Sequence, residues 1–191
     1  MSDRIVILDF GSQFTQLIGR RIRDMHVYCE LLPWNASESE AITPDTRGII
    51  LSGGPQSIYA PNAPYIQDYI LNSKLPILGI CYGMQALAHQ SGGAVEKSEE
   101  HEYGLARLTV AEPNPLLHLG DQKVWMSHGD KVFRLPDGYV GIAKTSNTPY
   151  AAMANYAQNR YGLQFHPEVH HSQYGTEIIQ NFVLKICTAQ S

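Results

Sequence analysis

Residues 76–89 read Pro-Ile-Leu-Gly-Ile-Cys-Tyr-Gly-Met-Gln-Ala-Leu-Ala-His, and they predict a strand that runs directly into a helix. The first five residues form a short apolar run, as in a strand that is covered on both faces. A helix over residues 83–89 follows almost at once. This arrangement is typical of α/β proteins with a parallel sheet.

The same alternation of strand and helix occurs on the N-terminal side. Residues 4–10 form a nearly continuous apolar run rich in β-branched residues, and residues 14–25 carry apolar side chains at helical spacing. Further strands are predicted over residues 27–32 and 48–52, and a helix over residues 64–71. Strands that alternate with helices imply right-handed crossovers and a mainly parallel open sheet with helices on both faces.

The second half of the chain has a different pattern, with short strand candidates separated by Gly, Pro and Asn turns. These candidates are residues 106–111, 123–127, 139–145, 150–155 and 161–165. We expect some of them to extend the main sheet and others to form antiparallel additions, before a closing helix over residues 175–187. The predicted fold class is therefore α/β, with extra antiparallel strands in the second half.

The composition favours one domain over residues 1–191, because 43% of the 191 residues are hydrophobic and can bury a single core. The 14 Lys and Arg and 18 Asp and Glu give a formal net charge of −4, so no basic face is expected to bind nucleic acid or an anionic membrane. The longest uncharged stretch, residues 75–95, is too polar and too broken for a membrane span. Three widely spaced cysteines argue against a disulfide framework, and no signal-peptide pattern is present, so we expect a cytoplasmic protein.

The sharpest local signal is Gly-x-Cys-x-Gly at the junction of strand and helix, with Cys81 at its centre. A nucleophile on such a strained turn needs small residues two positions before and after it, and Gly79 and Gly83 meet this requirement. Cys81 would then lie at the N-terminus of a helix, where free backbone N–H groups favour a thiolate. An isolated cysteine is more often a small buried hydrophobic residue, but the two glycines favour a nucleophile.

A cysteine nucleophile for acyl transfer needs a base, a group that orients the base, and donors for an oxyanion. His166 and Glu168 follow the strand candidate at residues 161–165, and on an extended backbone they point to the same side. Pro167 between them favours an extended chain. A triad of Cys81, His166 and Glu168 is therefore predicted.

The oxyanion donors are expected in the turn at Gly53 and Gly54 after the third strand, although Gly-Gly-Pro is first of all a turn. A metal site is the alternative interpretation for the histidines and the glutamate crowded into residues 166–171. Their spacing is not that of a helical zinc motif, and no cysteine pair accompanies them. No metal site is therefore predicted.

These motifs resemble the class I, triad-type glutamine amidotransferases, which carry Gly-x-Cys-x-Gly at an elbow, a Gly-Gly-Pro turn before it and His-Pro-Glu near the C-terminus. Further segments are similar to the amidotransferase part of GMP synthases: Ile7-Leu-Asp-Phe-Gly-Ser-Gln13, Ile50-Leu-Ser-Gly-Gly-Pro55, Gly79-Ile-Cys-Tyr-Gly-Met-Gln85, Val124-Trp-Met-Ser-His-Gly-Asp130 and Gly162-Leu-Gln-Phe-His-Pro-Glu-Val169. The resemblance covers essentially the whole chain and implies a flavodoxin-like open sheet in a single glutamine amidotransferase domain.

The resemblance also implies a role for each matching residue. Cys81 attacks the side-chain amide of glutamine, His166 takes and returns the proton so that ammonia leaves, and Glu168 orients His166. The implied oxyanion donors are the backbone N–H groups of Gly53, Gly54 and Tyr82, and the implied substrate-binding residues are Gln85, Ser127, Gly129 and Asp130. His128 lies in the same segment and is left without a role, because a surface or interdomain histidine is the simpler interpretation.

A partner is implied as well, because a GMP synthase needs an ATP-pyrophosphatase part that activates XMP with ATP and Mg. The phosphate loop of that part resembles Ser-Gly-Gly-x-Asp-Ser, whereas the only Ser-Gly-Gly here is followed by Pro55. We therefore expect no cofactor in this chain, and either a separate subunit or, as the motifs favour, the N-terminal part of a longer synthetase. A class I amidotransferase serving another synthase and a catalytically silent binding module of the same fold stay open as alternatives.

Overall fold

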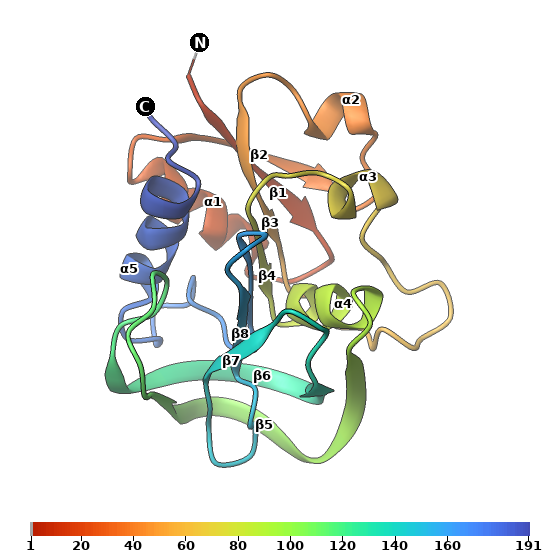
Figure 1. Cartoon of the computed structure of the whole chain (residues 1–191), viewed down its shortest axis with the longest axis vertical. Coiled ribbons are helices and arrows are strands. Elements are labelled where there is room, and N and C mark those ends of the chain that lie inside the picture. Colours follow the sequence, from red (N-terminus) through yellow and green to blue (C-terminus); the bar gives the residue numbers. More distant parts are fainter. Residues whose placement is uncertain (1) are drawn as a thin grey trace.

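The computed structural model describes residues 2–191 and contains two β-sheets. The strands are β1 (Arg4–Asp9), β2 (Tyr28–Pro33), β3 (Thr46–Leu51), β4 (Ile77–Ile80), β5 (Ala94–Val110), β6 (Gly120–Arg134), β7 (Val140–Ala143), β8 (Ala152–Asn155) and β9 (Arg160–Leu163). The main sheet has the order β2-β1-β3-β4-β9-β8-β7, and β5 and β6 form a separate ribbon (Figure 1). Pairing is parallel from β2 to β9, whereas β8 is antiparallel to both of its neighbours. The predicted α/β class, with antiparallel additions in the second half, is confirmed.

Helices cover both faces of the main sheet (Figure 1). The three longest helical segments are α1 (Thr15–Arg23), α4 (Tyr82–Gln90) and α5 (Gly175–Gln180) with the π-helical turn η1 (Asn181–Ile186) that continues it. In β1, the side chains of Ile5 and Ile7 pack into the core cluster that contains buried residues of α1 and α5. Val6 and Leu8 of the same strand pack into a second cluster with residues of α4. Alternate strand residues therefore supply two separate cores, one on each face of the sheet.

The β5–β6 ribbon lies across one end of the main sheet (Figure 1). The predicted strands at residues 106–111 and 123–127 fall within it, but the observed strands are much longer. The pairing is irregular between Lys97 and Glu102, in a stretch whose side chains are largely charged and exposed. Because hydrophobic alternation is lost there, the sequence pattern could not predict the length of the ribbon.

The predicted helix over residues 64–71 is wrong in its first half, because only Asp68–Leu71 forms a helix, α3. The side chain of Gln90 explains the difference. Its Oε1 accepts from the backbone N–H of Ile66 at 2.8 Å, and its Nε2 donates to the Ile66 carbonyl at 2.8 Å. Backbone groups that are paired with a distant side chain are not available for a helical turn.

Two further helical features were not predicted. The short helix α2 (Glu38–Ala41) begins at a capping box, in which Ser37 and Glu40 each bond the backbone of the other. The closing helix is confirmed in position, but its second half is the π-helical turn η1. Within residues 2–191 no helix is long and apolar enough to cross a membrane.

Candidate active site

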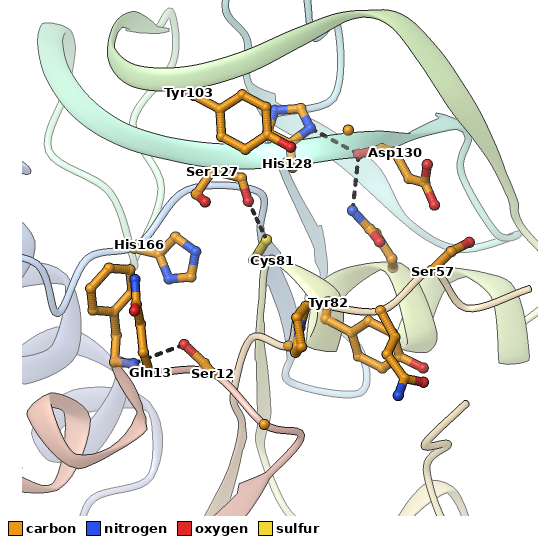
Figure 2. A pocket seen from close by; sticks show the side chains of 17 residues that line it. Ser12, Gln13, Ser57, Cys81, Tyr82, Tyr103, Ser127, His128, Asp130 and His166 are labelled. Atoms are coloured by element: carbon orange, nitrogen blue, oxygen red, sulfur yellow. Dashed lines mark hydrogen bonds between the residues drawn. The ribbon is translucent and has the colours of Figure 1, made fainter. Parts of the chain in front are cut away.

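The predicted site residues gather at the carboxyl ends of the parallel strands, as is usual for open α/β sheets. Gly54 follows β3, Cys81 follows β4 and His166 follows β9. They line a cavity of about 620 Å³ that the β5–β6 ribbon closes on one side (Figure 2). The cavity is the place where the chemistry of these side chains can meet a small molecule.

Cys81 occupies a strained backbone conformation at the start of α4. Its φ of 53° and ψ of −106° lie in a region that non-glycine residues rarely adopt. The turn is fixed by a 2.6 Å hydrogen bond from the Cys81 backbone N–H to the Leu163 carbonyl. A Cβ on Gly79 would lie 2.6 Å from the Gly83 carbonyl oxygen, and one on Gly83 would lie 2.5 Å from the Leu51 carbonyl oxygen. The predicted glycine requirement of the elbow therefore has a direct steric cause.

His166 and Glu168 form a buried pair beside Cys81. Nδ1 of His166 lies 2.5 Å from Oε1 of Glu168, and the two side chains are 5% and 1% exposed. Glu168 reaches this position from a turn rather than from the extended backbone that was predicted. That turn is held by the Ser172 hydroxyl, which donates to the His166 carbonyl at 2.7 Å. The prediction that the two residues meet is confirmed, although the expected backbone conformation is wrong.

The surroundings of His166 favour its protonated form. Burial opposes the charge, but hydrogen bonds with Cys81 and Glu168 and the negative charge of Glu168 raise the pKa of His166 from 6.5 to about 10. The ring is further held by Phe14, whose ring meets it edge to face at a centroid distance of 5.3 Å. Phe14 was not predicted as a site residue, although it lies in the loop between β1 and α1, at the same sheet edge.

This charge makes folding stability depend on pH. We expect the free energy of unfolding of the wild type to fall relative to His166→Asn as the pH rises from about 6.5 towards about 10. A raised pKa stabilises the fold fully below about pH 6.5, and this contribution is lost progressively as the pH rises towards the folded-state pKa. Denaturant titrations of both proteins across this range measure the difference, and a difference that does not change with pH would contradict the protonated pair.

The predicted oxyanion donors are placed around Cys81. Gly54 and Tyr82 line the cavity, and Gly53 lies directly behind it, where an added Cβ would come within 2.9 Å of the His166 ring. A Cβ on Gly54 would collide with the Phe10 carbonyl. Within residues 2–191, no hydrogen bond uses the backbone N–H groups of Gly53, Gly54 or Tyr82. These donors are therefore free to bind an oxyanion.

The four predicted substrate-binding residues also line the cavity, namely Gln85, Ser127, Gly129 and Asp130. Gln85 donates from Nε2 to the Asp130 carbonyl at 2.9 Å, so α4 and β6 are linked across the cavity. The thiol of Cys81 lies 3.5 Å from the Ser127 carbonyl (Figure 2). Their binding roles stay predictions, but all four occupy positions from which a ligand beside Cys81 can be reached.

His128 is neither a surface residue nor outside the site. It is buried, lines the cavity and donates from Nδ1 to the Asp130 carbonyl at 2.8 Å (Figure 2). Its Nε2 lies 3.4 Å from Oε1 of Glu102. Burial raises the pKa of Glu102, but the nearby imidazole of His128 and hydrogen bonds from Thr148 and Thr145 hold it below its usual value. The interpretation of His128 as a surface histidine is therefore wrong.

Other lining residues were not predicted. They are Gly11, Ser12 and Gln13 after β1, Pro55, Gln56 and Ser57 after β3, and Tyr103 on β5. Those after β1 and β3 could have been inferred from the rule that strand ends gather at one edge. Tyr103 could not, because its place depends on how the ribbon crosses the sheet.

The arrangement is suited to covalent acyl transfer. A cysteine at a helix N-terminus, a buried imidazole with a carboxylate behind it, and free backbone N–H groups are the parts that this chemistry requires. Residues 2–191 contain no cluster of three or more His, Cys, Asp and Glu side chains that could hold a metal ion.

The chain is similar to glutamine amidotransferases and to part of the GMP synthases. The family model for class-I glutamine amidotransferases matches residues 6–186. The glutamine-hydrolysing GMP synthase of Thermosipho melanesiensis is 52% identical over 184 residues, which are 95% of this chain and 36% of that protein. The GMP synthase of Alteromonas mediterranea is 47% identical over 197 residues, covering 98% of this chain and 38% of that protein. The chain therefore spans little more than a third of the length of these relatives.

Solved structures share the same fold. The crystal structure of a protein from Thermoplasma acidophilum, provisionally described as one subunit of a GMP synthase, has a TM-score of 0.86 at 30% identity and covers 98% of this chain and 95% of its own. A glutamine amidotransferase from Thermotoga maritima has a TM-score of 0.76 at 21% identity, with 88% of this chain and 77% of that one covered. At that lower identity the likeness shows the fold alone.

Proposed function

Because the chain belongs to the class-I glutamine amidotransferase family, we propose that it hydrolyses glutamine to glutamate and ammonia through a thioester on Cys81. The observation that carries this proposal is that Cys81, on a strained elbow, and His166 line one cavity, with Glu168 bonded to His166. Strain of this kind costs free energy and persists at functional sites.

Glutamine binds with its amino-acid end between α4 and β6. Gln85, Ser127, Gly129 and Asp130 offer side-chain and main-chain groups there. This places the side-chain amide of glutamine beside the Cys81 sulfur and its carbonyl oxygen near the N–H groups of Gly54 and Tyr82. Holding the two reacting groups together in this way supplies much of the rate enhancement.

The first half of the reaction forms the thioester. His166 already holds a proton at Nε2, and the Cys81 sulfur beside it attacks the side-chain carbonyl carbon of glutamine as a thiolate. The oxyanion of the tetrahedral intermediate is held by free backbone N–H groups, and Glu168 stabilises the imidazolium through Nδ1. His166 then gives its proton to the leaving nitrogen, so that ammonia departs.

The second half releases glutamate. His166, now neutral, takes a proton from water, and the hydroxide attacks the thioester carbon. The C–S bond breaks, and the sulfur leaves as a thiolate beside the protonated His166. The cycle consumes one glutamine and one water and yields one glutamate and one ammonia, with Cys81 restored.

The relatives support a proposal for the use of the ammonia. They are glutamine-hydrolysing GMP synthases, and this chain matches only about a third of each of them. We propose that this domain supplies ammonia to an ATP-pyrophosphatase domain or subunit, which uses ATP and Mg to convert XMP to GMP in the cytoplasm. The chain itself then needs no cofactor.

Reconstitution tests this assignment. The chain is mixed with the ATP-dependent part of a GMP synthase, and GMP formation is measured with glutamine or with ammonia as nitrogen donor. We expect glutamine to replace ammonia only when both parts are present. If the chain hydrolyses glutamine but never supports GMP formation, it serves another synthase; if it does not hydrolyse glutamine at all, it is a silent module.

The intact site favours the first outcome. A silent module would have no need of the strained conformation at Cys81 or of the buried pair of His166 and Glu168. High identity to GMP synthases over nearly the whole chain favours that pathway over another synthase.

A further inference from the structure

Gln164 is a fully buried polar residue that has no part in the proposed reaction so far. It follows β9 directly, and its backbone N–H donates to the Ala151 carbonyl at 2.8 Å. Its side-chain Nε2 lies 3.5 Å from the sulfur of Cys81. An amide donor is thus directed at the reacting atom from a side that substrate does not occupy, because Gln164 does not line the cavity.

The direction of this amide is fixed by a second glutamine. Gln85 Nε2 donates to the Asp130 carbonyl at 2.9 Å and also to Oε1 of Gln164 at 3.2 Å. A backbone carbonyl can only accept, so the amino group of Gln85 must be the one that faces it. The same amino group then faces Oε1 of Gln164, which leaves the amino group of Gln164 directed towards Cys81.

The contacts of the sulfur differ in the protonation state that they favour. The Ser127 carbonyl, 3.5 Å from the sulfur, can accept a hydrogen bond from the thiol but repels a thiolate. The N–H of Gln164, in contrast, donates to the sulfur and is bound more strongly when the sulfur is negative. In the reactive state, with the proton on His166, the sulfur therefore has no proton to donate to the Ser127 carbonyl and keeps the bond from Gln164.

We propose that Gln164 is a further catalytic residue, whose side-chain amide stabilises and positions the Cys81 thiolate for attack on glutamine. This rests on the proposed function of the site. In the step concerned, the proton lies on Nε2 of His166, the thiolate forms the new C–S bond with its own electron pair, and the electrons of the carbonyl π bond move to the oxygen. Through Gln85, the same hydrogen-bond chain links the nucleophile to the region that holds the amino-acid end of the substrate.

The test replaces Gln164 by methionine, which has a similar shape but cannot donate a hydrogen bond. Gln122→Met is the matched control, because Gln122 is also buried and donates from Nε2, but to the His118 carbonyl away from the cavity. Two rates are measured, steady-state glutamine hydrolysis and alkylation of Cys81 by iodoacetamide, with the modified peptide identified by mass spectrometry. The second readout reports thiolate reactivity and needs neither glutamine nor a partner.

We expect Gln164→Met to lower kcat and the alkylation rate by about tenfold or more, with KM for glutamine changed by less than about threefold, as for loss of a hydrogen bond to a charged group. Gln122→Met leaves both rates near those of the wild type. Wild-type rates in folded Gln164→Met would overturn the proposal, and so would an equal loss in both variants. Glutamine hydrolysis by the Cys81→Ala variant would instead overturn the proposed function itself.

A second variant covers the case in which Gln164→Met does not fold. Gln164→Glu keeps the shape and an acceptor for Gln85 but places an oxygen where the amide nitrogen faces the sulfur. We expect it to lower kcat and the alkylation rate in the same direction. Retention of both rates in this variant would likewise overturn the role of Gln164.

Discussion

Cys81→Ala is expected to abolish glutamine hydrolysis, with kcat/KM falling roughly 10⁴-fold or more. The physical reason is that alanine cannot form the thioester, while direct attack by water lacks the positioned nucleophile. Alanine keeps the Cβ and the backbone of the elbow, so the fold is expected to remain. Ammonia release and circular dichroism measure the two effects on the same preparation.

The other cysteines provide the matched control. Cys29 and Cys187 are also buried free thiols, and neither lines the cavity. Cys29→Ala is expected to keep glutamine hydrolysis within about twofold of the wild type, because substitutions away from the site leave the transition state unchanged. Equal losses in Cys29→Ala and Cys81→Ala would point to a general loss of folded protein.

Gly83→Ala is expected to cause a large loss of stability. The added Cβ would lie 2.5 Å from the Leu51 carbonyl oxygen and 2.8 Å from the Leu51 Cβ, so β3 and α4 must separate. Overpacking of this kind costs about 3 kcal/mol, which outweighs the gain of about 1 kcal/mol in helix propensity. Because Cys81 lies two residues away, we also expect kcat to fall about 100-fold.

Gly141→Ala, a substitution outside the elbow, is the matched control. In Gly141→Ala, the new Cβ would meet only the ring of Tyr150, at 3.0 Å, and a side chain can move more easily than backbone. Thermal unfolding and glutamine hydrolysis are measured for both variants. A Gly83→Ala protein as stable and active as Gly141→Ala would show that close packing at the elbow is not required.

The parallel half of the fold and the triad could be predicted because their constraints are local. Strand β4 is continuously apolar, and the steric limits at Gly79 and Gly83 leave a visible spacing around Cys81. His166 follows the strand candidate at residues 161–165, so it too is expected at the carboxyl edge of the sheet. The close match of sequence motifs to a known family supplied the roles of these residues.

The features of the fold and the site that could not be predicted depend on contacts between segments far apart in the sequence. Residues 64–67 are kept out of a helix by the side chain of Gln90. The ribbon brings His128 into the cavity beside Asp130, and its charged part carries no clear strand pattern. Gln164 lies two residues before His166, but only the register between β9 and β4 shows that its amide faces Cys81.

Covalent labelling tests the central claim most directly. The protein is treated with a glutamine analogue that carries a diazomethyl ketone in place of the side-chain amide, and the labelled peptide is identified by mass spectrometry. We predict a single adduct on Cys81, prevented by excess glutamine, with Cys29 and Cys187 unmodified. An adduct on another residue, or labelling of Cys81 that glutamine does not reduce, would contradict the assignment of Cys81 as the nucleophile that attacks glutamine.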